Sequence, residues 1–283
     1  MGVMKAAAIF ALLAGLASAA CASTVRLPRQ ALELNTAGAR ALLRGDLPAA
    51  EACFSVALEY SPRFVEAWVN LGYVELRRGN FEQARRDFTK GRDLNQDIPA
   101  PHHALGLWAD KSGRGEEAEK YYRAALKVDP GFAPARANLA RGLFARGQYE
   151  DAREQFQRLE HVAPDVVDGW AGEGETLLQL GREAEADEVV TRARDRFGDA
   201  PALMLLVGRQ RLARGEWNDA EAVLAPLVGE PDRGRACAAL AWIAVGRVGR
   251  GDVAGALSAA RAALAIDRDD ETARYALTLA SPR

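Results

Sequence analysis

Apolar residues recur along the 283-residue chain in short stretches that end at a glycine and then resume. In residues 65–88, VEAWVNLGYVELRRGNFEQARRDF, large and small apolar residues stand on both sides of Gly79. Their spacing predicts two antiparallel helices, each with one apolar face, that meet at a tight turn. Copies of this pattern fill most of the chain, so the sequence predicts an all-α fold of repeated helix pairs.

The small residues repeat with a constant step when the unit is numbered from residue 65 to residue 98. The eighth position reads Gly38, Gly72, Gly106, Ala140, Gly174 and Gly208. The fifteenth reads Gly45, Gly79, Gly113, Gly147, Gly181 and Gly215, and the twentieth reads Ala50, Ala84, Ala118, Ala152, Ala186 and Ala220. A seventh copy, displaced by two residues, supplies Gly251 and Ala256. We therefore expect units starting near residues 31, 65, 99, 133, 167, 201 and 237.

Each repeated position has a physical role in this prediction. Glycine at the fifteenth position can take the left-handed conformation that ends the first helix. Asp46, Asn80 and Asp252 follow it and are expected to cap the second helix. The small residues at the eighth and twentieth positions are expected to face each other across the pair. The second helix ends near a proline in several units, namely Pro62, Pro130 and Pro164.

The pattern resembles the tetratricopeptide repeat family, whose units are helix-turn-helix pairs of this length. The resemblance implies a right-handed superhelical solenoid of about seven units over residues 31–270, with residues 271–283 as a capping helix and tail. Two units depart from the pattern. Unit five has Glu173 in place of a large apolar residue and Gly198 in place of the closing proline, and unit seven follows an inserted VGEPDRGR.

In tetratricopeptide arrays the first helix of each unit (the A helix) lines a concave groove that binds protein segments. Carried over to this chain, the groove positions that we single out are Asn70, Tyr73, Arg77, His103, Leu107, Asn138, Arg141 and Phe144. The two amides are expected to hold the backbone of an extended peptide, the apolar and aromatic residues its side chains, and the arginines a carboxylate. The alternative that these residues serve no single ligand stays open.

A more specific groove, the clamp that grips the carboxyl end of chaperones, is not expected. Its positions are occupied here, in the frame that starts at unit one, by Asn35, Ala39, Asn70, Ala100 and Ala104. The lysine and arginine side chains that this clamp requires are absent from that set.

Residues 1–20 have the composition of a secretory signal peptide, with Lys5 followed by an uncharged run. The segment before Cys21 resembles a bacterial lipobox, although Ser18 stands where that motif usually has leucine. This implies a lipid on Cys21, residues 21–30 as a tether, and an exported protein anchored at the outer membrane. Cleavage after Ala19 is the alternative, and it would release a soluble periplasmic protein.

The remaining chemistry argues for binding and against catalysis. Formal net charge is −2, which gives no basic excess for nucleic acid. The three cysteines and three histidines show no zinc-type spacing, and His102 and His103 are adjacent on a helix, where their side chains diverge. We expect no catalytic residue, metal, cofactor or small-molecule substrate. Cys53 and Cys237 are expected to be helix-packing thiols.

These observations predict a non-enzymatic adaptor of the bacterial cell envelope that binds protein partners or extended peptides. Its leader and number of repeats resemble the lipoproteins of type IV and tight-adherence pilus systems, which help a secretin assemble. The alternatives are a soluble periplasmic scaffold or holdase, and an accessory subunit of a polysaccharide export or cytochrome maturation complex.

Overall fold

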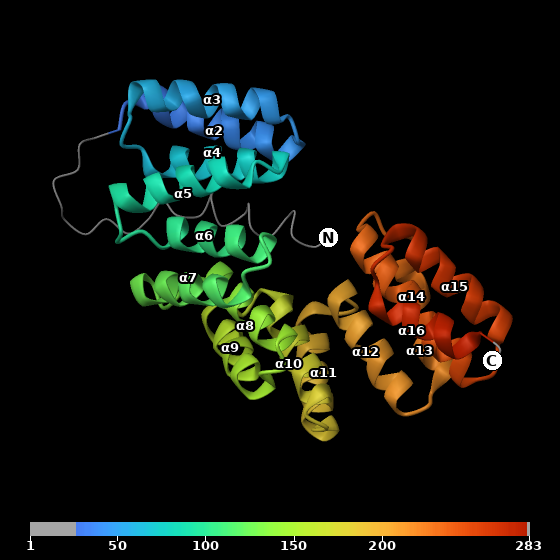
Figure 1. Cartoon of the computed structure of the whole chain (residues 1–283). Coiled ribbons are helices and arrows are strands. Elements are labelled where there is room, and N and C mark those ends of the chain that lie inside the picture. Colours follow the sequence, from blue (N-terminus) through green and yellow to red (C-terminus); the bar gives the residue numbers. More distant parts are fainter. Residues whose placement is uncertain (1–26, 282–283) are drawn as a thin grey trace. The chain divides into compact units, whose positions relative to one another are not determined.

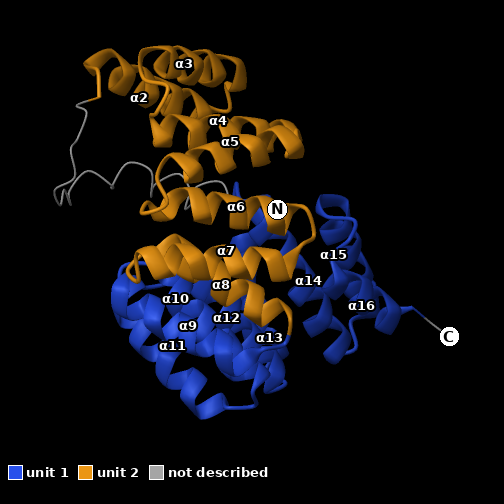
Figure 2. Cartoon of the chain, turned by 60° about the vertical axis from the view of Figure 1, so that its left-hand side comes forward, with its two compact units in different colours: residues 1–10, 147–283 blue, residues 11–146 orange. Residues whose placement is uncertain are grey.

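The computed structural model describes residues 27–281, and within this range it contains α-helices, one short 3-10 helix and no strand (Figure 1). Residues 27–146 form one compact unit and residues 147–281 another (Figure 2). The predicted leader with Cys21, and most of the predicted tether, lie outside the described residues. No helix among the described residues is long and apolar enough to cross a membrane.

The unit of residues 27–146 contains α2 to α8. Their bounds are α2 Arg29–Arg44, α3 Leu47–Tyr60, α4 Val65–Arg78, α5 Phe81–Leu94, α6 Pro99–Lys111, α7 Gly115–Val128 and α8 Ala133–Ala145. α2, α4 and α6 each pack against the helix that follows, and α3, α5 and α7 each pack against the next A helix. The expected succession of helix pairs is therefore present.

The unit of residues 147–281 contains α9 to α16. Their bounds are α9 Tyr149–Val162, α10 Val167–Gln179, α11 Glu183–Phe197, α12 Pro201–Ala213, α13 Trp217–Leu224, η1 Ala225–Gly229, α14 Arg233–Gly249, α15 Val253–Ile266 and α16 Glu271–Ala280. α14 begins earlier than the predicted start near residue 237, because Asp232 accepts hydrogen bonds from the backbone of Gly234 and Arg235 and caps it there. α16 packs against α14 and α15.

The turn inside each helix pair has the predicted geometry. Gly79 ends α4 with φ 85°, and Gly251 ends the corresponding turn between α14 and α15 with φ 84°. Every fifteenth-position glycine of the described residues has a positive φ, whereas no other residue type does. A side chain at these positions would be strained, which explains why the glycine repeats.

The eighth-position glycine makes a contact that the sequence analysis did not predict. A Cβ placed on Gly72 would lie 2.5 Å from Cδ1 of Phe88, so the aromatic ring at position twenty-four covers this glycine. Gly38 and Phe54 make the same contact one unit earlier. The glycine therefore makes room for a ring, and its pairing with the alanine stays a prediction.

The predicted helix caps are confirmed at two of three positions. The Asp46 carboxylate accepts from the Ala49 backbone at 3.2 Å, and that of Asp252 from the Gly255 backbone at 2.9 Å. Asn80 makes no cap hydrogen bond. Its side-chain nitrogen instead donates to Oε2 of Glu75 at 2.7 Å, because that buried carboxylate at the end of α4 lies within reach.

In five helices the side chain of the fourth residue holds the loop that precedes the helix by a hydrogen bond. It bonds to the carbonyl oxygen of the residue six positions earlier, on the loop that enters the helix. The pairs are Trp68 with Pro62 at 2.9 Å, His102 with Gln96 at 3.1 Å, Arg136 with Pro130, Trp170 with Pro164 at 3.3 Å, and Arg274 with Arg268 at 2.8 Å. At the start of α12 this position is Met204, whose thioether cannot donate.

Candidate functional site

The eight predicted groove residues lie on α4, α6 and α8 of the unit of residues 27–146. α2 packs against α4, and α4 against α6. A hydrogen bond between the fifth position of one A helix and the sixth position of the next connects α2 to α4 and α6 to α8. We define this face of α2, α4, α6 and α8 as the A-helix surface.

Asn70 belongs to the floor of the A-helix surface. Its side-chain nitrogen donates to Oδ1 of Asn35 on α2 at 2.9 Å, and the residue is 1% exposed. The Asn70 Oδ1 atom is buried without a hydrogen-bond partner. The amide therefore contacts the neighbouring A helix, and its role toward a peptide backbone stays a prediction.

Asn138 makes the equivalent connection between α8 and α6. Its side-chain nitrogen lies 2.8 Å from Nε2 of His103, and the Arg141 guanidinium donates to its oxygen. His103 is 3% exposed, and burial, reinforced by the positive charge of Arg141, lowers its pKa to about 3. The imidazole is therefore neutral at physiological pH and accepts the amide hydrogen bond through Nε2.

Tyr122, which the sequence analysis did not single out, adds a polar group beside this network. Tyr122 on α7 is buried, and its hydroxyl donates to Oδ2 of Asp110 on α6 at 2.5 Å. Desolvation raises the pKa of the Asp110 carboxyl, and the Tyr122 hydrogen bond opposes that rise together with the charges of Arg146 and Arg141. The signal was present in the sequence, because Tyr122 stands where the two preceding units have Phe54 and Phe88.

The accessible part of the A-helix surface carries arginine and aromatic groups. Arg77 and Arg141 are exposed, Tyr73 and Phe144 are half-buried, and Leu107 is buried. The Arg77 guanidinium donates to the Leu42 carbonyl oxygen at 2.5 Å, which fixes it over the last turn of α2. The Tyr73 ring meets the edge of Phe88 at 5.2 Å between centroids, and burial raises the pKa of its hydroxyl.

The unit of residues 147–281 contains two neighbouring carboxyl groups, the half-buried Glu160 on α9 and the buried Glu173 on α10. Glu173, the unusual residue of unit five, accepts from Nε2 of Gln157 at 2.6 Å and lies 3.7 Å from Arg153 and 4.0 Å from Arg192. The Glu160 carboxyl hydrogen-bonds Glu173. Burial and this neighbour raise the pKa of Glu160 to about 8, so the Glu160 carboxyl is mostly protonated at neutral pH.

Neither the histidines nor the cysteines form a cluster in the described part of the chain. His102 bonds to the Gln96 carbonyl while His103 bonds to Asn138, so the adjacent rings point to different partners. No group of three or more His, Cys, Asp or Glu residues within 27–281 is placed to hold a metal ion. Cys53 and Cys237 are free thiols, and burial raises the pKa of Cys237 to about 11.

Comparison with known families is decisive for the class of protein. Tetratricopeptide repeat profiles match residues 35–95 and residues 111–172. These two stretches of the chain are tetratricopeptide repeats. A solved tetratricopeptide repeat protein from Parabacteroides merdae superposes with a TM-score of 0.70 at 16% identity, over 89% of this chain and 99% of that one. The tetratricopeptide fold thus extends over nearly the whole chain.

Two curated relatives match the chain only in part. The type IV pilus assembly protein PilF of Pseudomonas aeruginosa is 28% identical over 128 residues, 44% of this chain and 50% of PilF. Its solved structure superposes with a TM-score of 0.57 over 75% of this chain and 95% of that one, at 19% identity. The human protein O-mannosyl-transferase TMTC3 is 24% identical over 157 residues, 50% of this chain and 17% of TMTC3. The chain therefore spans half or less of these relatives' lengths.

Proposed function

We propose that this protein is a non-enzymatic adaptor that binds an extended protein segment on the A-helix surface. The observation that carries this proposal is the division of that surface into two layers. Asn70, His103 and Asn138 form a buried floor that joins the helices, whereas Arg77 and Arg141 are exposed above it. Such a rigid floor holds the exposed side chains in place before a partner arrives, which limits the entropy lost on binding.

The chemistry of the exposed side chains favours a partner segment with acidic and apolar residues. Arginine pairs with carboxylates through charge-assisted hydrogen bonds. Tyr73 and Phe144, both half-buried on the same surface, offer apolar contact beside them. In this proposal the two amides contribute by fixing the spacing of the A helices and not by direct contact with the peptide backbone.

The proposed setting is a bacterial envelope machine of the type IV pilus class. Similarity to PilF supports this setting, together with the composition of residues 1–20 and the position of Cys21. In the proposal, acyl chains on Cys21 tether the repeats to the outer membrane, where they assist assembly of a secretin. Mass spectrometry of the mature amino terminus tests the tether, since an acylated Cys21 is expected and an Ala20 start would contradict it.

Purification from detergent-solubilised membranes tests the partner. We expect a secretin to co-purify with the wild-type chain and to be depleted at least tenfold with the Arg77→Glu, Arg141→Glu double variant. The matched control is Arg86→Glu, Arg123→Glu, which changes two exposed arginines on α5 and α7. An unchanged secretin oligomer after deletion of the gene would contradict the proposal.

A further inference from the structure

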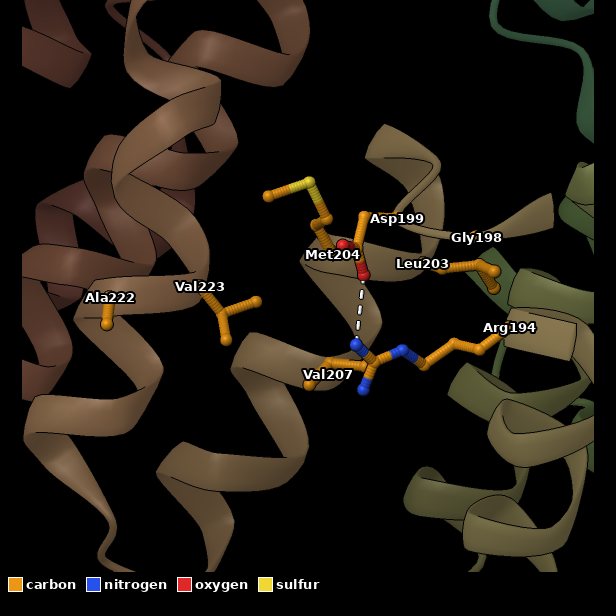
Figure 3. Close-up of a pocket in the computed structure, with 8 residues that line it drawn as sticks. All are labelled: Arg194, Gly198, Asp199, Leu203, Met204, Val207, Ala222 and Val223. Carbon is orange, nitrogen blue, oxygen red and sulfur yellow. Dashed lines mark hydrogen bonds and ion pairs between the residues drawn. The ribbon is translucent and has the colours of Figure 1, made fainter.

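A pocket of about 230 Å3 lies where α11, α12 and α13 meet (Figure 3). Its wall is aliphatic on two helices and polar at the end of the third. α12 supplies Leu203, Met204 and Val207, α13 supplies Ala222 and Val223, and Arg194, Gly198 and Asp199 come from the end of α11. The Arg194 guanidinium donates to Oδ1 of Asp199 at 2.9 Å, and both side chains are largely exposed. The pocket is thus apolar inside with an ion pair at its rim.

The pocket lies beside the loop between α11 and α12, where two residues differ from those at the same repeat positions one unit earlier. In the preceding unit the Trp170 indole donates to the Pro164 carbonyl. At the start of α12 the same two positions are Met204 and Gly198. A large ring and a proline are therefore replaced by a flexible thioether and a residue without a side chain.

One unit earlier, the position equivalent to Met204 is occupied by Trp170. Its ring packs against a cluster that contains Ala186 and Val189 on the second helix of its unit, and it meets the Phe197 ring edge-on at 6.3 Å. The residue equivalent to Val189 in the next unit is Val223, which lines the pocket. The space beside Met204 is therefore the place that an indole fills one unit earlier.

We propose that this pocket binds an aromatic side chain of a partner polypeptide, in place of the ring that the repeat itself supplies at Trp170. The proposal rests on the protein-binding function proposed above but concerns a different surface. The pocket is smaller than the roughly 300–1,000 Å3 of typical small-molecule sites, which favours a single side chain. The Arg194 and Asp199 side chains at the rim supply a donor and an acceptor for the main chain on either side of that ring.

The methyl group of Met204 reports directly on the pocket, because it is the one methionine of residues 27–281. The full chain labelled with 13C-methyl methionine is titrated with N-acetyl-tryptophanamide, with N-acetyl-leucinamide as the comparison. We expect a saturable shift of the Met204 resonance with a Kd of about 1 mM, in the range of a single small fragment. The leucine amide should bind at least fivefold more weakly, and equal binding would overturn the assignment to an aromatic side chain.

Ala222→Leu fills the pocket from an exposed position of α13 and keeps the Met204 probe. We expect it to weaken the tryptophanamide at least tenfold, while the matched Ala254→Leu on the exposed face of α15 leaves the titration unchanged. Circular dichroism checks that both variants are folded. No saturable shift in the wild type, or an equal shift in Ala222→Leu, overturns the pocket and leaves secretin binding on the A-helix surface untouched. If the wild-type titration is saturable but no secretin co-purifies with the chain, the proposed function fails and the pocket proposal stands.

Discussion

The side-chain nitrogen of Asn138 lies 2.8 Å from Nε2 of His103, so position six of one A helix is joined to position five of the helix before it. Asn70 and Asn35 are joined in the same way at 2.9 Å. Both pairs are 35 residues apart, one more than the repeat length. The same register therefore links α2 to α4 and α6 to α8 through one side-chain hydrogen bond at each of these two contacts.

This relationship predicts how the chain responds to acid. The pKa of His103 falls to about 3 in the folded state, below its ordinary value, so its contribution to stability is present above about pH 6.5. That contribution is lost as pH falls from 6.5 toward 3, because the unfolded chain binds the proton more tightly. His103→Gln should flatten this part of the curve of unfolding free energy against pH by about 1–3 kcal/mol. His161→Gln, at an exposed histidine, should leave it unchanged.

The carboxyl groups of Glu160 and Glu173 should make the fold less stable as pH rises, whereas His103 makes it less stable as pH falls. The pKa of Glu160 rises to about 8, so its contribution to stability is complete below about pH 4.5 and is lost as pH rises through 8. Glu160→Gln keeps a hydrogen-bonding group without a charge, and it should stabilise the chain above pH 8 by roughly 1–3 kcal/mol. Urea unfolding from pH 5 to 9 measures this. A parallel gain in Glu154→Gln, an exposed site on the same helix, would refute the assignment to the pair.

Tyr122→Phe should show whether the hydroxyl matters beyond the ring. The change keeps the packing against Gly106 but removes the hydrogen bond to Asp110. A hydrogen bond to a charged group is worth more than a neutral one, and we expect a loss of about 1–2 kcal/mol at pH 7. Tyr60→Phe, at an exposed position, should change unfolding by less than about 0.5 kcal/mol. Equal effects of the two variants would mean that the Asp110 contact contributes nothing.

Gly72 lies close to the Phe88 ring, so replacing it by alanine should destabilise the fold. Helix propensity alone predicts the opposite effect. Alanine is the better helix former, yet a Cβ at Gly72 would overlap the ring, so Gly72→Ala should destabilise by about 1–3 kcal/mol. At Gly115 the nearest neighbour of an added Cβ is a flexible Arg146 atom at 3.7 Å. Gly115→Ala should therefore be neutral or stabilising by up to about 1 kcal/mol. Thermal unfolding of the two variants separates these outcomes.

The sequence predicted the features that depend on residues within one helix pair. Gly79 and its equivalents must take positive φ wherever a pair turns, and the apolar face of residues 271–280 indicated a helix that the structure contains. The sequence did not predict which side chains of successive units would contact each other. The hydrogen bond of Asn70 depends on Asn35, one unit away. Within a helix pair, the sequence did not predict that Asn80 donates to Glu75 and does not cap α5. Gly198 was noted as a departure, but only the structure shows a pocket beside it.

Site-specific photocrosslinking tests the central claim, that the A-helix surface is where a protein partner binds. A benzoylphenylalanine replaces Phe144 on the A-helix surface in one variant and Tyr60, exposed on α3, in another, so both changes keep an aromatic ring. After irradiation in cells, mass spectrometry identifies the adducts. We predict a single protein partner joined through position 144 and at least tenfold less adduct at position 60. Adducts at position 60 alone, or equal adducts at both positions, would contradict the claim.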